Sequence, residues 1–166
     1  THASGTSFSQ VEDGVRHAME RGFKCVRAQV AIPGLEGTYG ISRTPAVSAG
    51  VTGHPDSLPP QETFEPAPYL RTIPKLFEHL RCKLGEEIEL LHDCHERLDP
   101  VQAARLAHEL EPYHLFFLED CLRPEYKESF RLIREHSTTP LAMGELFNSL
   151  WDCVPLIKEQ LIDYIR

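Results

Sequence analysis

The chain has 166 residues and a formal net charge of -8, and 41% of its residues are hydrophobic and 25% charged. That length suits one domain of roughly 100–200 residues, but it is short for a complete (β/α)8 barrel, which needs ~250 residues. The acidic balance argues against a nucleic-acid partner, and no apolar run reaches the ~18 residues of a membrane span. Five cysteines without a C-x-x-C pair predict free thiols and hence a cytoplasmic protein.

The first part of the chain predicts two strands, a helix and a long loop. A truncated strand over 1–3 precedes a helix over 7–21, in which apolar residues recur at helical spacing. A second strand follows over 23–30. Seven of the 13 prolines and five of the 10 glycines lie between positions 33 and 68. This composition predicts a loop over about 31–68, and loops of such length are usually functional or disordered.

Helices and apolar strands alternate in the rest of the chain. A helical pattern resumes at Tyr69, and Pro74 within it predicts a kink or a later start. Later helices are expected to be one capped by Asp99, one carrying Tyr126, Phe130 and Ile133, and one carrying Val154, Ile157 and Leu161. Strands are expected over 88–93, 115–118, 140–143 and 162–166. This alternation predicts a parallel sheet, either a barrel or an open doubly wound sheet, and no Gly-rich sequence supports a nucleotide site.

Three acidic residues follow successive strands at equal spacing. Asp93, Glu119 and Glu145 lie 26 residues apart, one strand–helix unit each. Because neighbouring parallel strands end at the same edge, ~4.8 Å apart, we expect the three carboxylates to lie side by side. Oxygen ligands of this kind suit Mg²⁺. The alternative is that each is an ordinary acidic residue at a strand end.

The segments around these acids are distinctive. They cover 91–95, 118–120, 144–149 and 161–166. Together they resemble the enolase superfamily, and within it the mannonate dehydratase subgroup of acid-sugar dehydratases, some relatives of which are named for starvation sensing. The resemblance implies an α/β fold over 1–166, a single incomplete (β/α)8 TIM-type barrel of roughly strands one to six. The last strands and the N-terminal capping domain of such proteins are not matched.

The same resemblance implies roles for individual residues. Lys24 is not followed by a second lysine two positions later, which disfavours the branches with a lysine base. Arg27 with Tyr39 twelve residues later matches the subgroup, so Tyr39 is the expected base, because a nearby cation favours tyrosinate. Side-chain alternation in an extended chain places His95 on the same face as Asp93 and directs His92 away from it. The resemblance makes His95 the expected acid for the departing hydroxyl. Mg²⁺ ligation is implied for Asp93, Glu119 and Glu145, and substrate contact for His2, Glu145 and Arg166.

The activity implied by the resemblance is Mg²⁺-dependent removal of water from a sugar acid. D-mannonate would give 2-keto-3-deoxy-D-gluconate through an enediolate whose charge the metal stabilises. D-gluconate or another acid sugar is the alternative substrate. A catalytically weak starvation-sensing or regulatory binding protein is an alternative function, and a purely structural metal site is a third. A homo-oligomer, tetramer or octamer, is implied for the full-length protein, with no nucleic-acid or membrane partner, and the isolated chain is expected to be inactive.

Overall fold

A computed structural model describes residues 1–32 and 64–166 of the chain. Within them, one parallel sheet has its six strands in chain order. The strands are β1 (His2–Gly5), β2 (Cys25–Val30), β3 (Glu89–Asp93), β4 (Phe117–Glu119), β5 (Leu141–Met143) and β6 (Tyr164–Ile165). A doubly wound sheet reverses its strand order at a switch point, whereas a barrel wall does not. The strand order therefore confirms the partial-barrel prediction.

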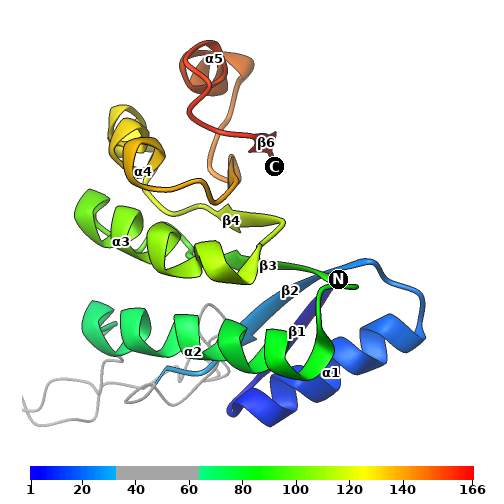
Figure 1. Ribbon diagram of the computed structural model, residues 1–166. Helices are drawn as coiled ribbons and strands as arrows, with labels where there is room; N and C mark the ends of the chain where they lie inside the picture. The colour runs from blue at the N-terminus through cyan, green and yellow to red at the C-terminus, as the bar shows by residue number, and fades with distance from the viewer. Residues whose placement is uncertain (33–63) are drawn as a thin grey trace, which may run out of the picture.

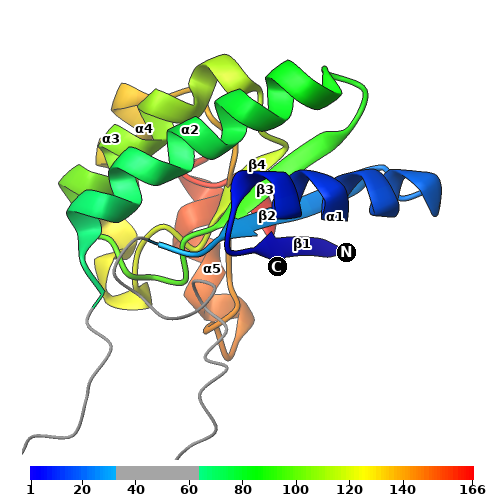
Figure 2. The ribbon, with the colours of Figure 1, turned by 90° about the horizontal axis from the view of Figure 1, so that it is seen from below.

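Helices cover one side of this wall. They are α1 (Phe8–Glu20), α2 (Pro66–Leu84), α3 (Pro100–Leu110), α4 (Phe130–His136) and α5 (Leu150–Lys158). Figure 1 shows α2, α3 and α4 following one another along the sheet, and Figure 2 shows the same three helices on one side of β3 and β4. In this row α2 packs on α3 and α3 packs on α4. No helix in the described ranges is both long enough and apolar enough to cross a membrane.

Two helices begin at capping residues that the sequence indicates. The Ser7 side chain accepts a hydrogen bond from the Gln10 N–H at the start of α1. The Asp99 carboxylate accepts one from the Gln102 N–H, and the Gln102 side chain accepts one from the Asp99 N–H. Such caps satisfy amide groups that have no partner within the helix. The expected helix over 7–21 is thus confirmed to within one residue at each end.

The second helix begins earlier than the sequence predicts. It starts at Pro66, before Tyr69, and runs through Pro74 to Leu84. A proline suits the first turn, because the N–H that it lacks would have no helical partner there. Pro74 removes one hydrogen bond from the interior, and the packed apolar face of α2 tolerates that loss. The expectation of a later start is wrong.

Two expectations in the region of β4 and α4 need correction. The strand predicted over 115–118 covers Phe117–Glu119 instead, although Leu115 is buried as a strand residue would be. Tyr126 was expected on a buried helix face, but it lies in a 3-10 turn spanning Pro124–Ser129 and is 46% exposed. Phe130 and Ile133 are buried on α4, as predicted.

The buried face of α5 also differs from the prediction. Cys153 and Leu156 are its buried residues, whereas Ile157 points to solvent and Leu161 is buried beyond the end of the helix. The outward side of α5 carries apolar residues too, among them Trp151. Hydrophobic periodicity cannot select the buried face when both faces are apolar.

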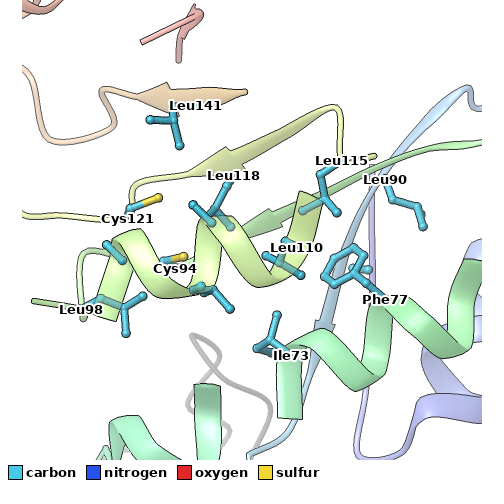
Figure 3. Close-up of a cluster of buried hydrophobic side chains, with 14 of the residues drawn as sticks. Ile73, Phe77, Leu90, Cys94, Leu98, Leu110, Leu115, Leu118, Cys121 and Leu141 are labelled. Atoms are coloured by element: carbon cyan, nitrogen blue, oxygen red, sulfur yellow. The ribbon is translucent and has the colours of Figure 1, made fainter. Parts of the chain in front are cut away.

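Buried apolar side chains fill the space between the sheet and the helices. Figure 3 shows Ile73 and Phe77 of α2 near Leu90 of β3, whereas Leu118 of β4 lies against α3. These four residues are fully buried. This packing fixes β3 and β4 relative to each other, and their last residues are candidate site residues.

All five cysteines lie in the described residues, and none of them forms a disulfide there. Cys94 and Cys121 lie in the core just beyond β3 and β4 (Figure 3). A hydrogen bond with the Cys94 thiol, together with burial, raises the pKa of the Cys121 thiol. A thiol in such surroundings is unreactive, because only the thiolate is a strong nucleophile.

Arg81 of α2 joins three segments through backbone carbonyls. Its guanidinium donates to the carbonyl oxygens of Gly85, Ile88, Tyr113 and His114 at 2.7–3.0 Å. Replacing Arg81 by Lys keeps the charge but removes the planar fork, leaving some of these carbonyls without their donor. We expect a loss of about 2–3 kcal/mol in the free energy of unfolding.

Urea denaturation of the full-length protein measures this loss. Arg105→Lys is the matched control, because within the described residues Arg105 bonds only to Glu109, which is on the same helix and partly exposed. Equal midpoints for the two variants would contradict the role assigned to Arg81.

Candidate metal centre and acid–base site

Two buried carboxylates meet at the carboxyl edge of the sheet. Asp93 is the last residue of β3 and Glu119 is the last residue of β4, and the two are paired in register. Each is 1% exposed. The apolar strands that precede them hold the backbone, so the two carboxylates lie on neighbouring strands as the sequence predicts.

Glu145 lies further along the edge than equal spacing suggests. Glu119 is paired in register with Ala142, so Glu145 comes three residues beyond the position opposite Glu119. Arg166 spans the offset, because its Nη1 lies 2.7 Å from Glu145 Oε2 and its Nε contacts Glu119 Oε1. The three predicted ligands share one edge, but Glu145 is joined to Glu119 through an arginine.

Arg27 reaches the same carboxylates from β2. Its Nη1 lies 2.6 Å from Asp93 Oδ2 and 3.9 Å from Glu119 Oε2. The neighbouring Gln29 donates from its side-chain amide to the Asp93 carbonyl oxygen at 2.9 Å. Strand β2 therefore holds both the side chain and the backbone of Asp93.

The donor set fits a divalent cation such as Mg²⁺. One carboxylate oxygen each from Asp93, Glu119 and Asp120 lies within 4.8 Å of the others. Burial raises the pKa of Glu119 to about 7, and the negative charge of Asp93 adds to this, although Arg166 and Arg27 oppose it. Buried carboxylates that still repel one another after pairing with arginines are stabilised by a cation among them.

His95 returns to Asp93 through a turn. Its Nε2 lies 3.2 Å from Asp93 Oδ2, and its backbone N–H donates to Asp93 Oδ1 at 2.9 Å. From the sequence, His95 is expected near Asp93 because side chains two residues apart share a face in an extended chain. The backbone is instead left-handed at His95, with φ of 53°. The proximity was predicted, and the reason given for it is wrong.

His92 faces away from this group, as the sequence predicts. Its Nδ1 lies 2.9 Å from the Ala28 carbonyl oxygen, and its Nε2 lies 2.8 Å from the Tyr69 hydroxyl. Since a carbonyl only accepts, Nδ1 carries the proton and Nε2 accepts from Tyr69. Burial lowers the pKa of His92 to about 4, so the ring is neutral and structural.

The remaining predicted site residues are His2 and Arg166, which the structure describes, and Tyr39, which it does not. His2 is paired in register with Arg27. It lines a cavity of about 280 Å³ together with Glu119 and Arg166. The structure thus brings both predicted substrate contacts from the chain ends to the predicted metal ligands. Tyr39, the expected base, lies outside the described residues.

Asp120 and Glu96 are site residues that the sequence reasoning missed. Asp120 is fully buried, and its Oδ1 accepts from the Gly144 N–H at 3.0 Å. Alternation would direct Asp120 away from Glu119, but φ of 44° at Asp120 turns the chain. Burial and the carboxylates of Asp120 and Glu145 raise the pKa of Glu96 to about 7. The only sequence signal was their position next to predicted site residues.

Comparison with known proteins identifies the family. Residues 10–166 match the family described as enolase C-terminal domain-like. The chain belongs to this family. A D-mannonate dehydratase from Xanthomonas oryzae pv. oryzicola is 48% identical over 170 residues, which cover 99% of this chain and 39% of that protein. A D-galactonate dehydratase family member from Marinomonas sp. is 48% identical over 167 residues, with 99% and 40% covered.

A solved structure resembles the chain closely. An enolase from Pantoea ananatis, with bound D-gluconate and Mg, superposes with a TM-score of 0.83 at 43% identity, covering 99% of this chain and 41% of that one. This chain thus spans about 40% of the length of the curated relatives that it matches. The sequence-based resemblance to the enolase superfamily is confirmed.

Proposed function

We propose that this chain carries the metal ligands and the acid–base groups of a Mg²⁺-dependent dehydratase that acts on a sugar acid. The observation that carries the proposal is the joining of Asp93 and Glu119 with Arg27, His95 and Arg166 at one edge of the sheet. Relatives named as dehydratases support it, as does the Pantoea ananatis enolase with its bound D-gluconate and Mg.

The proposed ligands of Mg²⁺ are Asp93, Glu119 and Glu145, with Asp120 close to all of them. When bound, the ion supplies positive charge to the oxygens of the substrate carboxylate as the neighbouring carbon loses its proton. Arg166 lies between Glu119 and Glu145, so it is placed to pair with a substrate carboxylate that displaces one of them.

The acid–base work divides between two residues. Tyr39 takes the proton from the carbon next to the substrate carboxylate, and the positive charge of Arg27 favours the tyrosinate that this step needs. His95 gives a proton to the hydroxyl on the following carbon, which leaves as water. The resulting enol tautomerises to the 2-keto-3-deoxy acid. Asp93 orients the His95 ring through the contact between Asp93 Oδ2 and His95 Nε2.

The first candidate substrate is D-mannonate, and its epimer D-gluconate is the second. The name of the Xanthomonas oryzae relative favours D-mannonate, whereas the ligand of the Pantoea ananatis enolase favours D-gluconate. The Marinomonas relative is named only as a D-galactonate dehydratase family member. Discrimination between such epimers depends on a few hydrogen bonds to one hydroxyl. A regulatory binding protein on the same scaffold is the competing function, and it predicts binding of the acid without turnover.

An assay of the full-length protein tests the proposal. The protein is incubated with each epimer, with Mg²⁺ or with a chelator, and the 2-keto-3-deoxy product is measured. We expect Mg²⁺-dependent product from at least one epimer. Binding of both acids without product would instead favour the regulatory function.

A further inference from the structure

Glu96, Asp120 and Glu145 form a second carboxylate group beside Asp93 and Glu119. They come from the turns that follow β3, β4 and β5, and one oxygen of each lies within 4.8 Å of the others. We propose that this group binds a second divalent cation beside the first, and that the two ions share Asp120 and Glu145. The inference rests on the proposed function in one respect, namely that Glu145 is also a ligand of the first ion.

Two buried oxygens of this group have no hydrogen-bond partner among the described residues. Asp120 is fully buried, and although Oδ1 accepts from the Gly144 N–H, Oδ2 accepts from nothing in residues 1–32 and 64–166. Glu96 Oε1 is buried and unpartnered in the same part of the chain. A buried carboxylate is costly unless it is paired or ligates a metal. These oxygens therefore favour the binding of a cation between the two turns.

Arg123 lies near the group and lowers the pKa of Glu96, but within the described residues it forms no ion pair with Glu96 or Asp120. Asp93 is paired with Arg27, and Glu119 with Arg166. Within the described ranges, no Lys, Arg or His nitrogen lies within 4.0 Å of a carboxylate oxygen of Glu96 or Asp120. Arg166 reaches the third member, Glu145, with one nitrogen. Negative charge thus remains in excess on the side of the site that faces Glu96.

The group has the chemistry and access that a divalent cation needs. Carboxylate oxygens are preferred by Mg²⁺ and Mn²⁺, which complete their coordination with water. The Glu96 N–H donates to the Asp120 carbonyl at 2.7 Å, so the two turns are joined beside the proposed ion. Glu96 also lines a cavity of about 650 Å³ between the turns, shared with His95, Arg123 and Asn148. An ion could enter from this cavity.

Counting Mn²⁺ ions tests the inference. Bound Mn²⁺ is measured by electron paramagnetic resonance in the full-length protein, for Glu96→Gln, Glu119→Gln and the double variant. We expect each single variant to bind one ion fewer per chain than the unchanged protein, and the double variant two fewer. Glu128→Gln is the matched control, because it makes the same charge change at an exposed position that does not line this cavity, and it should lose none.

Two results would overturn the inference. In the first, Glu96→Gln binds as many Mn²⁺ ions as the unchanged protein. In the second, the double variant loses no more ions than Glu119→Gln alone, which would mean that both carboxylate groups share one ion. Glu96 is only partly buried and Gln has nearly the same shape, so the fold is retained, which circular dichroism checks. The proposed function fails separately, by absence of turnover while the ion counts follow the expected pattern.

Discussion

Glu119→Gln is expected to lower kcat/KM for the sugar acid by about 10³-fold, because a catalytic metal contributes several kcal/mol of charge stabilisation in the transition state. Glu119 is 1% exposed and lies between Asp93 and two arginines. Gln keeps the shape of the side chain but removes the negative charge, so Mg²⁺ loses a ligand while Arg27 and Arg166 remain. Calorimetry should show weaker Mg²⁺ binding in parallel with the loss of turnover.

The matched control is Glu128→Gln. Glu128 is exposed in the turn before α4 and lines neither of the two cavities described above, and the same change there should leave kcat/KM within about twofold, as is usual for surface substitutions. Unchanged turnover of Glu119→Gln at saturating Mg²⁺ would show that Glu119 is not a ligand of the catalytic ion.

His95→Asn is expected to lower kcat for dehydration by about 10²–10⁴-fold, the usual contribution of a general acid. The backbone N–H of residue 95 still donates to Asp93, so Mg²⁺ affinity should stay near that of the unchanged protein. The variant should also still exchange the proton next to the substrate carboxylate with deuterium from solvent, because the base is intact. Proton NMR in heavy water follows exchange and elimination together.

Tyr39→Phe provides the contrast. If Tyr39 is the base, this variant loses exchange and elimination equally, whereas His95→Asn loses only elimination. Loss of both reactions in His95→Asn, with Mg²⁺ affinity retained, would make His95 the base and contradict the assignment of Tyr39.

The sequence predicts well which residues lie at the carboxyl edge of the sheet. This is because strands made of continuous apolar residues can pair in few registers. Asp93 and Glu119 end two such strands, and the structure pairs them. Glu145 shows the limit of equal spacing. The step from Glu119 to its register partner Ala142 is shorter than the step from Asp93 to Glu119, so an interval of 26 residues does not ensure alignment.

Local backbone conformation explains the residues that were missed. His95, Glu96 and Asp120 all have positive φ, which non-glycine residues rarely adopt and which functional sites often contain. Alternation of side chains applies only to extended backbone, so it cannot predict where residues in such turns point. The αL turns bring Glu96 and Asp120 to the site, and no periodic pattern reveals them.

The proposed function requires that the carboxylates at this edge of the sheet support Mg²⁺-dependent dehydration of a sugar acid. The most direct test is the formation of 2-keto-3-deoxy product by the full-length protein, measured first with Mg²⁺, then after chelation, and again after Mg²⁺ is restored. If the proposed function is right, product forms from D-mannonate or D-gluconate, its formation stops on chelation, and it resumes when Mg²⁺ is restored. Turnover that persists without any divalent ion, or no turnover with Mg²⁺ bound, would contradict it.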